Sequence, residues 1–280
     1  MYKIVSKLEL SNGVFQMEIE APQIAKKVQS GQFIILRINK EGERIPLTVA
    51  DYDRQKGLVK IIFQAVGKST KLLGNMSQGE YILDFVGPLG KKSEIASDLG
   101  TVVCIGGGIG VAPIHPVARA MKEAGNKVIS VIGARNKDIL IMEDDMKKVS
   151  DEVIITTDDG SYGIHGFVTD ALKQIIDRGE IPSVVYAIGP VVMMRSVAEA
   201  TRAAGIKTIV SLNPIMIDGT GMCGCCRVSV GGETRFACVD GPEFDGHQVD
   251  FNELMMRLGM YRAEEEKAKD HICRIGLGRD

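Results

Sequence analysis

The sequence predicts an α/β protein with an added β-barrel: first an antiparallel barrel, then a doubly wound parallel sheet, then a small cysteine-rich segment. Short strands separated by turn residues run from residue 1 to about 98. Between 99 and 212, apolar strands alternate with helical segments, which indicates a parallel sheet covered by helices. From 213 to 280 the regular pattern stops and cysteines cluster. We take these three ranges as the expected domains.

The first range predicts a small antiparallel barrel. Apolar and β-branched residues recur in short runs, several of them in alternation, and turn signals such as Ser11-Asn12-Gly13 separate the runs. This pattern is typical of small closed β-structures. The expected strands are Tyr2–Leu8, Val14–Glu20, Phe33–Ile38, Leu58–Ala65 and Tyr81–Phe85.

The second range predicts a parallel sheet with helices on both faces. Short apolar runs read TVVCI, KVISVIGA, EVIITT, SVVYAI and KTIVSL, and they are typical of strands buried on both faces. The segments between them predict helices over 112–124, 138–149, 166–178 and 191–204. In the last range a further helix is expected from Phe251, capped by Asp250 and Glu253.

Composition excludes several classes of protein. The 280 residues are 45% apolar and 25% charged, with a net charge of -2, so no basic field indicates a nucleic-acid partner. The apolar runs are too short to span a membrane. No apolar signal segment follows Met1, so we expect a cytoplasmic protein. In that reducing compartment, clustered cysteines indicate a metal or redox site rather than disulfides.

The cysteine cluster predicts a [2Fe–2S] centre. Asp218, Cys223, Cys226 and Cys238 follow the order Asp-x4-Cys-x2-Cys-x11-Cys, and plant-type ferredoxins use Cys-x4-Cys-x2-Cys with a distant fourth cysteine. The aspartate stands where the first cysteine would be. Glycines between the ligands let the backbone bend around a cluster. Cys225 is the alternative ligand, and it would replace Asp218 in an irregular Cys-x-Cys-Cys arrangement.

Two loops in the second range predict a nucleotide site. The sequence GGGIGVAP (106–113) follows a strand and opens a helix, where close backbone approach and the helix dipole favour a pyrophosphate. Val111 stands in place of the third glycine of the usual fingerprint. A second loop follows strand SVVYAI. Taken alone, the first loop favours a nucleotide over a plain tight turn, and the second favours a turn. The expected contacts are Gly107, Gly108, Gly110 and Pro113, then Gly189, Pro190 and Met193.

Two short motifs in the barrel are candidate cofactor contacts. The first combines a cation, a proline and a hydroxyl, and the second is a glycine with two hydroxyls at a helix start, where phosphate oxygens bind. Each is also consistent with a salt bridge or a helix N-cap. The candidate residues are Arg44, Pro46, Leu47 and Thr48, then Val66, Gly67, Ser69 and Thr70.

Together, and in this order, these motifs resemble the ferredoxin–NADP reductase superfamily. The segments ERIPLTVAD, GGGIGVAP, DDGSYG and DGTGMCGCCRV resemble dihydroorotate dehydrogenase B electron-transfer subunits. They resemble even more the small subunits of NADH-dependent reduced ferredoxin:NADP oxidoreductases, also described as sulfide dehydrogenase beta subunits. The resemblance covers essentially the whole chain. It implies an FAD-binding barrel, a nicotinamide-nucleotide domain and a [2Fe–2S] cluster held by one aspartate and three cysteines.

The resemblance also implies a function and a partner. Electrons would pass between NAD(H), FAD and the cluster, and then to a larger subunit with a second FAD and [4Fe–4S] clusters, where NADPH and ferredoxin react. Electron bifurcation and polysulfide reduction are among the implied activities. No protein acid, base or nucleophile is required. One departure is that Arg44 stands four residues before Thr48, where the superfamily has three, which weakens its assignment to the flavin pyrophosphate.

Two rival functions stay open at this point. The first is the electron-transfer subunit of dihydroorotate dehydrogenase B, which normally has cysteine where this chain has Asp218. The second is a non-enzymatic redox sensor that binds flavin and uses its cluster as a switch. Such a sensor needs no nicotinamide crevice, so rapid flavin bleaching by NADH would exclude it.

The nucleotide preference depends on the loop after strand EVIITT. Asp158 and Asp159 stand where NADP-specific members carry groups for the 2′-phosphate, and carboxylates instead accept hydrogen bonds from ribose hydroxyls. This favours NAD(H), although Arg135 after the preceding strand argues for NADP(H).

The remaining cysteines and histidines predict no further site. Cys104 lies in an apolar strand and is expected in the core, and Cys273 has no cysteine neighbours. Zinc is not expected, because the histidines lack metal-binding spacing. They stand at His115, His165, His247 and His271.

Overall fold

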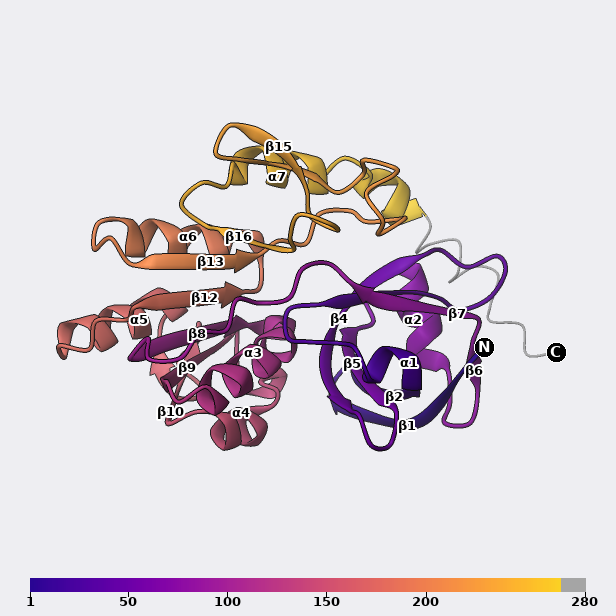
Figure 1. The fold of residues 1–280 in the computed structure, drawn as a ribbon, viewed down its shortest axis with the longest axis horizontal. Helices are drawn as coiled ribbons and strands as arrows, with labels where there is room; N and C mark the ends of the chain where they lie inside the picture. The colour runs from indigo at the N-terminus through magenta and orange to yellow at the C-terminus, as the bar shows by residue number, and fades with distance from the viewer. Residues whose placement is uncertain (268–280) are drawn as a thin grey trace.

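The computed structural model describes residues 1–267, so Cys273 and His271 lie outside the described residues. Two seven-stranded sheets lie side by side, and a smaller region with a two-stranded sheet packs over them (Figure 1). The first sheet is antiparallel and nearly closed, and the second is largely parallel with helices on both faces. The predicted fold class is therefore confirmed.

The first sheet has the strand order β6-β1-β2-β5-β4-β3-β7. Its core is formed by buried residues such as Ile34 and Leu36, which alternate along β3 with side chains that face the other way. Two short helices, α1 and α2, lie between strands of this sheet in the sequence. The elements are β1 (Tyr2–Ser11), β2 (Val14–Glu20), α1 (Pro22–Ala25), β3 (Phe33–Arg37), β4 (Ile45–Asp53), β5 (Leu58–Gln64), α2 (Lys68–Asn75), β6 (Tyr81–Ile82) and β7 (Asp84–Leu89).

Strand β4 is missing from the sequence-based prediction. The sequence around Pro46 predicts a turn, but this residue lies within β4 and pairs with Ile35 of β3. A proline is tolerated in a strand where its missing N–H faces away from a ladder partner. The predicted strand Tyr81–Phe85 is also divided, since β6 pairs with β1 whereas β7 pairs with β3.

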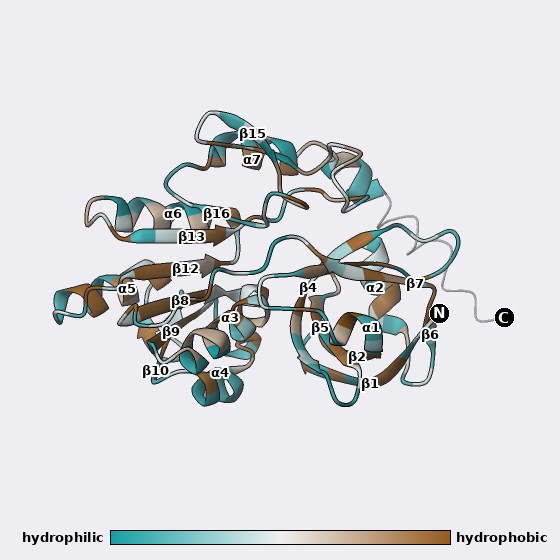
Figure 2. Ribbon diagram, viewed as in Figure 1, coloured by the Kyte–Doolittle hydropathy of each residue, from teal (hydrophilic) through white to brown (hydrophobic). Residues whose placement is uncertain are grey.

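The second sheet has the order β11-β10-β9-β8-β12-β13-β16, and only β16 runs antiparallel to its neighbour. Val102 and Cys104 of β8 face one helical layer, and Val103 and Ile105 face the other. Figure 2 shows hydrophobic residues along the central strands and hydrophilic ones on the outward surface of α4. The elements are β8 (Thr101–Gly107), η1 (Gly108–Gly110), α3 (Val111–Glu123), β9 (Lys127–Ala134), η2 (Lys137–Ile139), α4 (Glu143–Val149), β10 (Glu152–Thr157), β11 (Ile164–His165), α5 (Val168–Asp177), β12 (Val184–Ile188), α6 (Val191–Arg202) and β13 (Lys207–Ser211).

The helix predicted over 138–149 is interrupted. A 3-10 turn ends at Ile139, and α4 begins at Glu143 because Met142 adopts a left-handed conformation with φ of 60°. The prediction of a single helix here is wrong, since such a conformation ends helical geometry.

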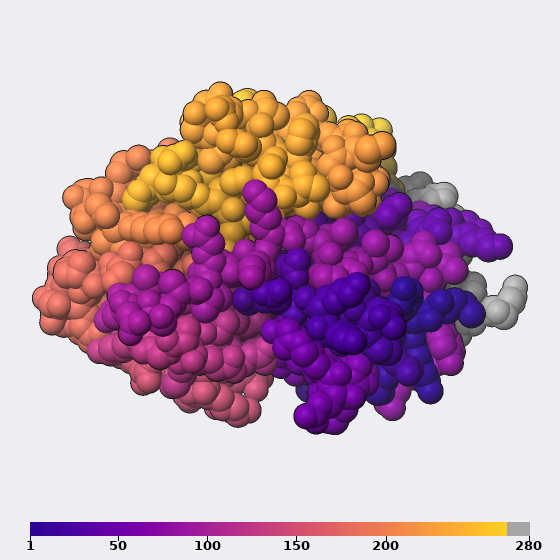
Figure 3. All heavy atoms as spheres, in the orientation of Figure 1, coloured from indigo at the N-terminus to yellow at the C-terminus, as the bar shows by residue number. Residues whose placement is uncertain are grey.

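The region after residue 212 is more ordered than its sequence predicts. It contains the hairpin β14 (Arg227–Val230) and β15 (Glu233–Phe236), then β16 (Glu243–Asp245) and α7 (Phe251–Leu258). The Asp250 half of the expected cap is confirmed, because an Asp250 carboxylate oxygen accepts the backbone N–H groups of Asn252 and Glu253, each at 3.0 Å. The Asp250 N–H donates to the carbonyl oxygen of Ser229 instead of to the Glu253 side chain. Figure 3 shows this region resting on both other parts.

Within residues 1–267, every helix falls short of the length and apolar character that a membrane span requires.

Candidate functional site

A cavity of about 890 Å³ lies between the barrel and the parallel sheet. Residues from the barrel motifs and from both nucleotide loops line it together. This is the arrangement expected for open α/β sheets, where ligands bind outside the carboxyl ends of the strands. The predicted residues that line the cavity are Pro46, Leu47, Thr48, Val66, Thr70, Gly107, Gly108, Gly110, Pro113, Arg135, Asp158, Gly189, Pro190 and Met193.

The glycine loops are packed too closely for side chains. A Cβ at Gly110 would lie 2.1 Å from the carbonyl oxygen of Ile188, at the end of β12. A Cβ at Gly107 would lie 2.3 Å from Sδ of Met193, which comes from the second loop. The two loops are thus in direct contact, and Gly110 brings the start of α3 against the edge of the sheet, as the third glycine of the usual fingerprint does.

The two carboxylates of the nucleotide loop are not equivalent. Asp158 lines the cavity together with Arg135. Asp159 does not, and its carboxylate accepts the backbone N–H of Ser161 at 2.9 Å in a local turn. The hydroxyl of Ser161, followed by its N–H, lowers the pKa of Asp159. Asp158 is therefore the carboxylate available to a ligand.

Three other predicted contacts also lie outside the lining. Ser69 donates a hydrogen bond of 2.5 Å to the carboxylate of Glu43, and Gly67 caps α2, where Thr70 Oγ1 accepts its N–H at 3.0 Å. Arg44 is exposed, and its charge acts on Asp218 of the cysteine loop. The assignments of Arg44, Gly67 and Ser69 to a cofactor remain predictions.

Sequence reasoning missed several lining residues. Ser211 ends β13, Leu212 and Asn213 follow it, and Phe167 and Thr169 lie at the start of α5. The signal for the first group was present, since these residues end a predicted parallel strand and such strand ends meet at one edge. Gln64 and Ser196 also line the cavity, and no motif marks them.

The cysteine loop gathers its thiols on the side of β3 that faces away from the barrel core. Cys226 and Cys238 are buried with Sγ atoms 3.1 Å apart, which is longer than the ~2.05 Å of a disulfide. They pack with Phe33 and Ile35 of β3. Cys223 is exposed and Cys225 half-buried. Every cysteine of the described residues is a free thiol.

Local charges divide the thiols into two kinds. Burial raises the pKa of Cys238 to about 12, and the neighbouring Cys226 thiol acts in the same direction. By contrast, the backbone N–H of Cys225 and then that of Asp218 lower the pKa of Cys223. A coordinating metal deprotonates thiols outright, so both kinds are competent iron ligands.

Asp218 belongs to the same loop. Its Oδ2 accepts hydrogen bonds from the Thr220 hydroxyl and from the N–H groups of Thr220 (3.0 Å) and Met222 (3.4 Å). The Thr220 hydroxyl is the main cause of a lowered pKa, and the charge of Arg44 contributes. The residue is half-buried, and the lowered pKa favours the ionised carboxylate that a metal ligand requires.

The donor chemistry of this loop, three thiols and a carboxylate, fits a two-iron cluster. Within residues 1–267, no group of at least three His, Cys, Asp or Glu side chains is placed to hold one metal ion. A [2Fe–2S] cluster spreads four ligands over two irons, and Cys226 with Cys238 forms one such close pair. Gly219, Gly221 and Gly224 all have φ between 68° and 85°, which gives the loop the curvature a cluster needs.

Comparisons with known proteins agree with this geometry. Residues 104–199 match the oxidoreductase NAD-binding domain family, and residues 213–250 match the iron–sulfur cluster binding domain of dihydroorotate dehydrogenase B. A dihydroorotate dehydrogenase B electron-transfer subunit homolog of Thermotoga maritima is 48% identical, covering 94% of this chain and 93% of that protein. The electron-transfer subunit of Streptococcus thermophilus is 34% identical over 88% of this chain and 96% of its own.

The chain belongs to the family of dihydroorotate dehydrogenase B electron-transfer subunits and their homologs. The similarity extends to a solved structure of NADH-dependent reduced ferredoxin–NADP oxidoreductase, described for flavin-based electron bifurcation. That structure is 46% identical with a TM-score of 0.92, over 98% of both chains. As a family member the chain is an electron-transfer oxidoreductase subunit of a larger complex, and its domains support FAD, [2Fe–2S] and NAD(H).

The structure also shows where the remaining cysteine and the histidines of the described residues lie. Cys104 is completely buried in β8, which confirms its role in the core. His115 is buried at the contact between α3 and β4, and His165 ends β11. His247 lies between β16 and α7, where its Nε2 is 3.0 Å from Thr201 Oγ1.

Proposed function

We propose that this chain passes electrons between NAD(H) and a larger partner subunit in the cytoplasm, using FAD in the barrel and a [2Fe–2S] cluster in the cysteine loop. The observation that carries the proposal is the single cavity lined by both the barrel motifs and the nucleotide loops. The cysteine loop packs on β3, whose neighbour β4 lines that cavity. The cavity and the cysteine loop therefore contact adjacent strands, since the cavity-lining Pro46 and Thr48 pair with Ile35 and Phe33.

The residues of this chain hold and orient the groups. Pro46, Leu47 and Thr48 would line the flavin, and Gly107 to Gly110 would hold the nucleotide pyrophosphate against the start of α3. When bound, FAD supplies the conversion between two-electron and one-electron chemistry, and the cluster supplies a one-electron relay. Asp218, Cys223, Cys226 and Cys238 would hold the iron.

We propose as partner a subunit with a second FAD and [4Fe–4S] clusters, where ferredoxin and NADPH react. The similarity to the bifurcating oxidoreductase supports this choice. Asp218 supports it as well, since dihydroorotate dehydrogenase B subunits, the second candidate, normally carry cysteine there. Polysulfide reduction is a further activity that this complex could have.

We also propose 1–98, 99–212 and 213–280 as the domain ranges. Strand β16 of the last range joins the parallel sheet beside β13, so the cysteine region is built onto the nucleotide domain.

Purification under anaerobic conditions tests the cofactor assignment. The chain should carry one FAD and one [2Fe–2S] cluster, that is about two irons, and NADH should bleach the flavin. Iron and flavin analysis together with visible spectra provide the measurement. Four irons, zinc, or a protein that takes up no flavin on reconstitution would contradict the assignment.

The variants Asp158→Arg and Asp159→Arg test whether the site prefers NAD(H) to NADP(H). We expect NADH to reduce the flavin faster than NADPH, because Asp158 faces the cavity and repels a 2′-phosphate. Asp158→Arg should shift the preference toward NADPH by about ten-fold or more, through a new charge-assisted contact. Stopped-flow bleaching with both nucleotides measures this.

Asp159→Arg is the control, because the Asp159 side chain lies in the adjacent turn and does not line the cavity. It should change the preference little. A wild type that clearly prefers NADPH would make Arg135, which also lines the cavity, the determinant instead.

A further inference from the structure

The contact between strand β4 and helix α3 connects the two halves of the cavity. Pro46, Leu47 and Thr48 at the start of β4 line the flavin half, and Asp51 follows three residues later on the same strand. Helix α3 continues directly from the glycine loop of the nucleotide half, and its residue Arg119 reaches Asp51. Any change in this contact therefore changes how the two halves face each other.

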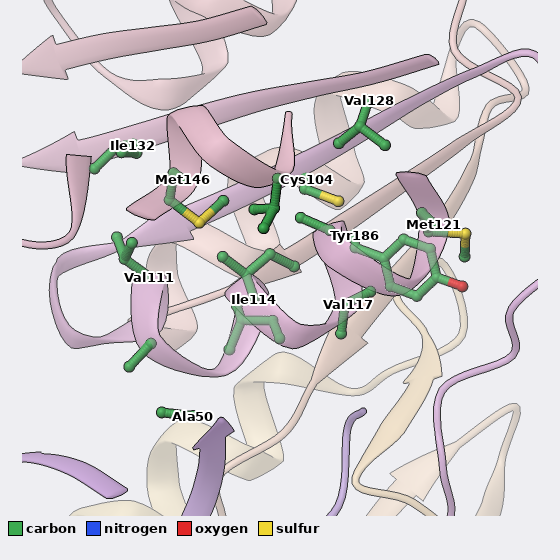
Figure 4. Close-up of a cluster of buried hydrophobic side chains, with 14 of the residues drawn as sticks. Ala50, Cys104, Val111, Ile114, Val117, Met121, Val128, Ile132, Met146 and Tyr186 are labelled. Atoms are coloured by element: carbon green, nitrogen blue, oxygen red, sulfur yellow. The ribbon is translucent and has the colours of Figure 1, made fainter. Parts of the chain in front are cut away.

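A β-bulge aims β4 at the helix. In the pairing with β5, Val49 is opposite Ile61 and Asp51 is opposite Lys60, so Ala50 is an extra residue in β4. Such bulges bend a strand and redirect its side chains. Ala50 consequently packs into the core of the nucleotide domain, against Val111 and Ile114 of α3 (Figure 4). His115 of α3 is buried here and contacts the backbone of Ala50.

The bulge also places Asp51 against Arg119. Their closest atoms, Nη1 and Oδ1, are 2.5 Å apart, and both side chains are largely shielded, with 26% and 23% of their surface exposed. The second oxygen, Oδ2, lies 3.8 Å from Lys60 Nζ. The Arg119 guanidinium also lies 5.3 Å from the ring centre of Tyr52. Arg119 at this half-buried contact is restrained from two sides, because its guanidinium faces both the Asp51 carboxylate and the Tyr52 ring.

We propose that Arg119, through Asp51, is a positioning residue for hydride transfer: it locks α3 onto β4 and so sets the approach of the nicotinamide to the flavin. This inference rests on the proposed function. Neither side chain lines the cavity, so neither touches the cofactors directly. Displacement of reacting groups by about 1 Å can cost on the order of a hundred-fold in rate, so a small loosening of this contact is measurable.

The test compares wild type with Arg119→Ala, Arg119→Lys and Asp51→Asn. At saturating NADH, flavin bleaching should slow about ten-fold in Arg119→Ala and Asp51→Asn, and Arg119→Lys should recover part of the rate. FAD content, the cluster spectrum and reduction by dithionite should stay at wild-type values. Arg178→Ala is the matched control, because Arg178 forms an equally close pair with Glu152 inside the nucleotide domain.

Hydrogen exchange provides a readout independent of turnover. Amides of β4 and α3 should exchange faster in Arg119→Ala and Asp51→Asn, with α5 unchanged, whereas Arg178→Ala should loosen only its own surroundings. If NADH does not bleach the wild-type flavin, the proposed function fails. Hydrogen exchange in β4 and α3 still tests whether Arg119 and Asp51 hold these two elements together. If wild type is bleached and both Arg119→Ala and Asp51→Asn bleach at its rate, the positioning role is overturned. Unchanged exchange in β4 and α3 would overturn the lock itself.

Discussion

Replacing Asp218 by alanine is expected to remove the iron–sulfur cluster and to leave flavin binding and NADH-dependent bleaching in place. Within the described residues, the hydrogen bonds of the carboxylate all come from its own loop, from Thr220 and Met222, so its loss should remove a ligand without disturbing either sheet. Iron should fall from about two atoms per chain to near zero. Iron analysis and the EPR signal of the reduced protein measure the result.

Two companion variants identify the fourth ligand. Asp218→Cys should keep the cluster with a changed reduction potential and EPR signal, because a thiolate is a softer ligand than a carboxylate. Cys225→Ala should leave the cluster spectrum nearly unchanged. An intact cluster in Asp218→Ala, together with a lost one in Cys225→Ala, would mean that Cys225 and not Asp218 binds iron.

The second large effect is a loss of stability with rising pH that originates at Glu243 of β16. Its carboxylate lies against the linker of residues 90–100, which joins β7 to β8, and accepts a 2.6 Å hydrogen bond from Ser93 Oγ in that linker. It also lies 2.8 Å from the position a Cβ at Gly31 would occupy. The residue retains some exposed surface, but its charged atoms are enclosed. Burial raises the pKa of Glu243 to about 7.

The direction of the effect follows from this shift. Since the folded pKa exceeds the ordinary value of 4.5, the folded chain keeps a proton that the unfolded chain releases. The stabilisation is complete below about pH 4.5 and is lost as the pH rises through about 7, in total about 3 kcal/mol. Glu94 raises the pKa further, and the Ser93 hydrogen bond opposes it.

Glu243→Gln isolates this contribution. The free energy of unfolding of the variant relative to wild type should increase by about 3 kcal/mol between pH 5 and pH 8, because glutamine does not ionise. Urea unfolding of both proteins at several pH values measures it. Glu233→Gln, on the exposed strand β15, is the control. Its free energy of unfolding should change with pH as that of wild type does. A pH-independent difference between Glu243→Gln and wild type would show that Glu243 ionises normally.

The sequence by itself determined the chemistry of this protein and the order of its parts. The spacing of Asp218 and the cysteines is local, because a cluster is wrapped by one loop and its glycines. The glycine loop after β8 and the parallel sheet could also be predicted from the sequence, since turns and buried strands depend on nearby residues. Strand β4 was missed because its proline suggests a turn, and only pairing with β3 shows otherwise.

Only the tertiary structure decided which side chains face each other. Asp158 and Asp159 are adjacent and identical in type, yet one lines the cavity and the other closes a turn. Arg44 lies near Asp218 rather than in the cavity, although its motif predicted a flavin contact. The pair Asp51 and Arg119 depends on a bulge of one residue, and Glu243 is enclosed by a linker 150 residues away in sequence. Such contacts depend on how sheets and loops pack over long separations, and no local pattern of residue types encodes them.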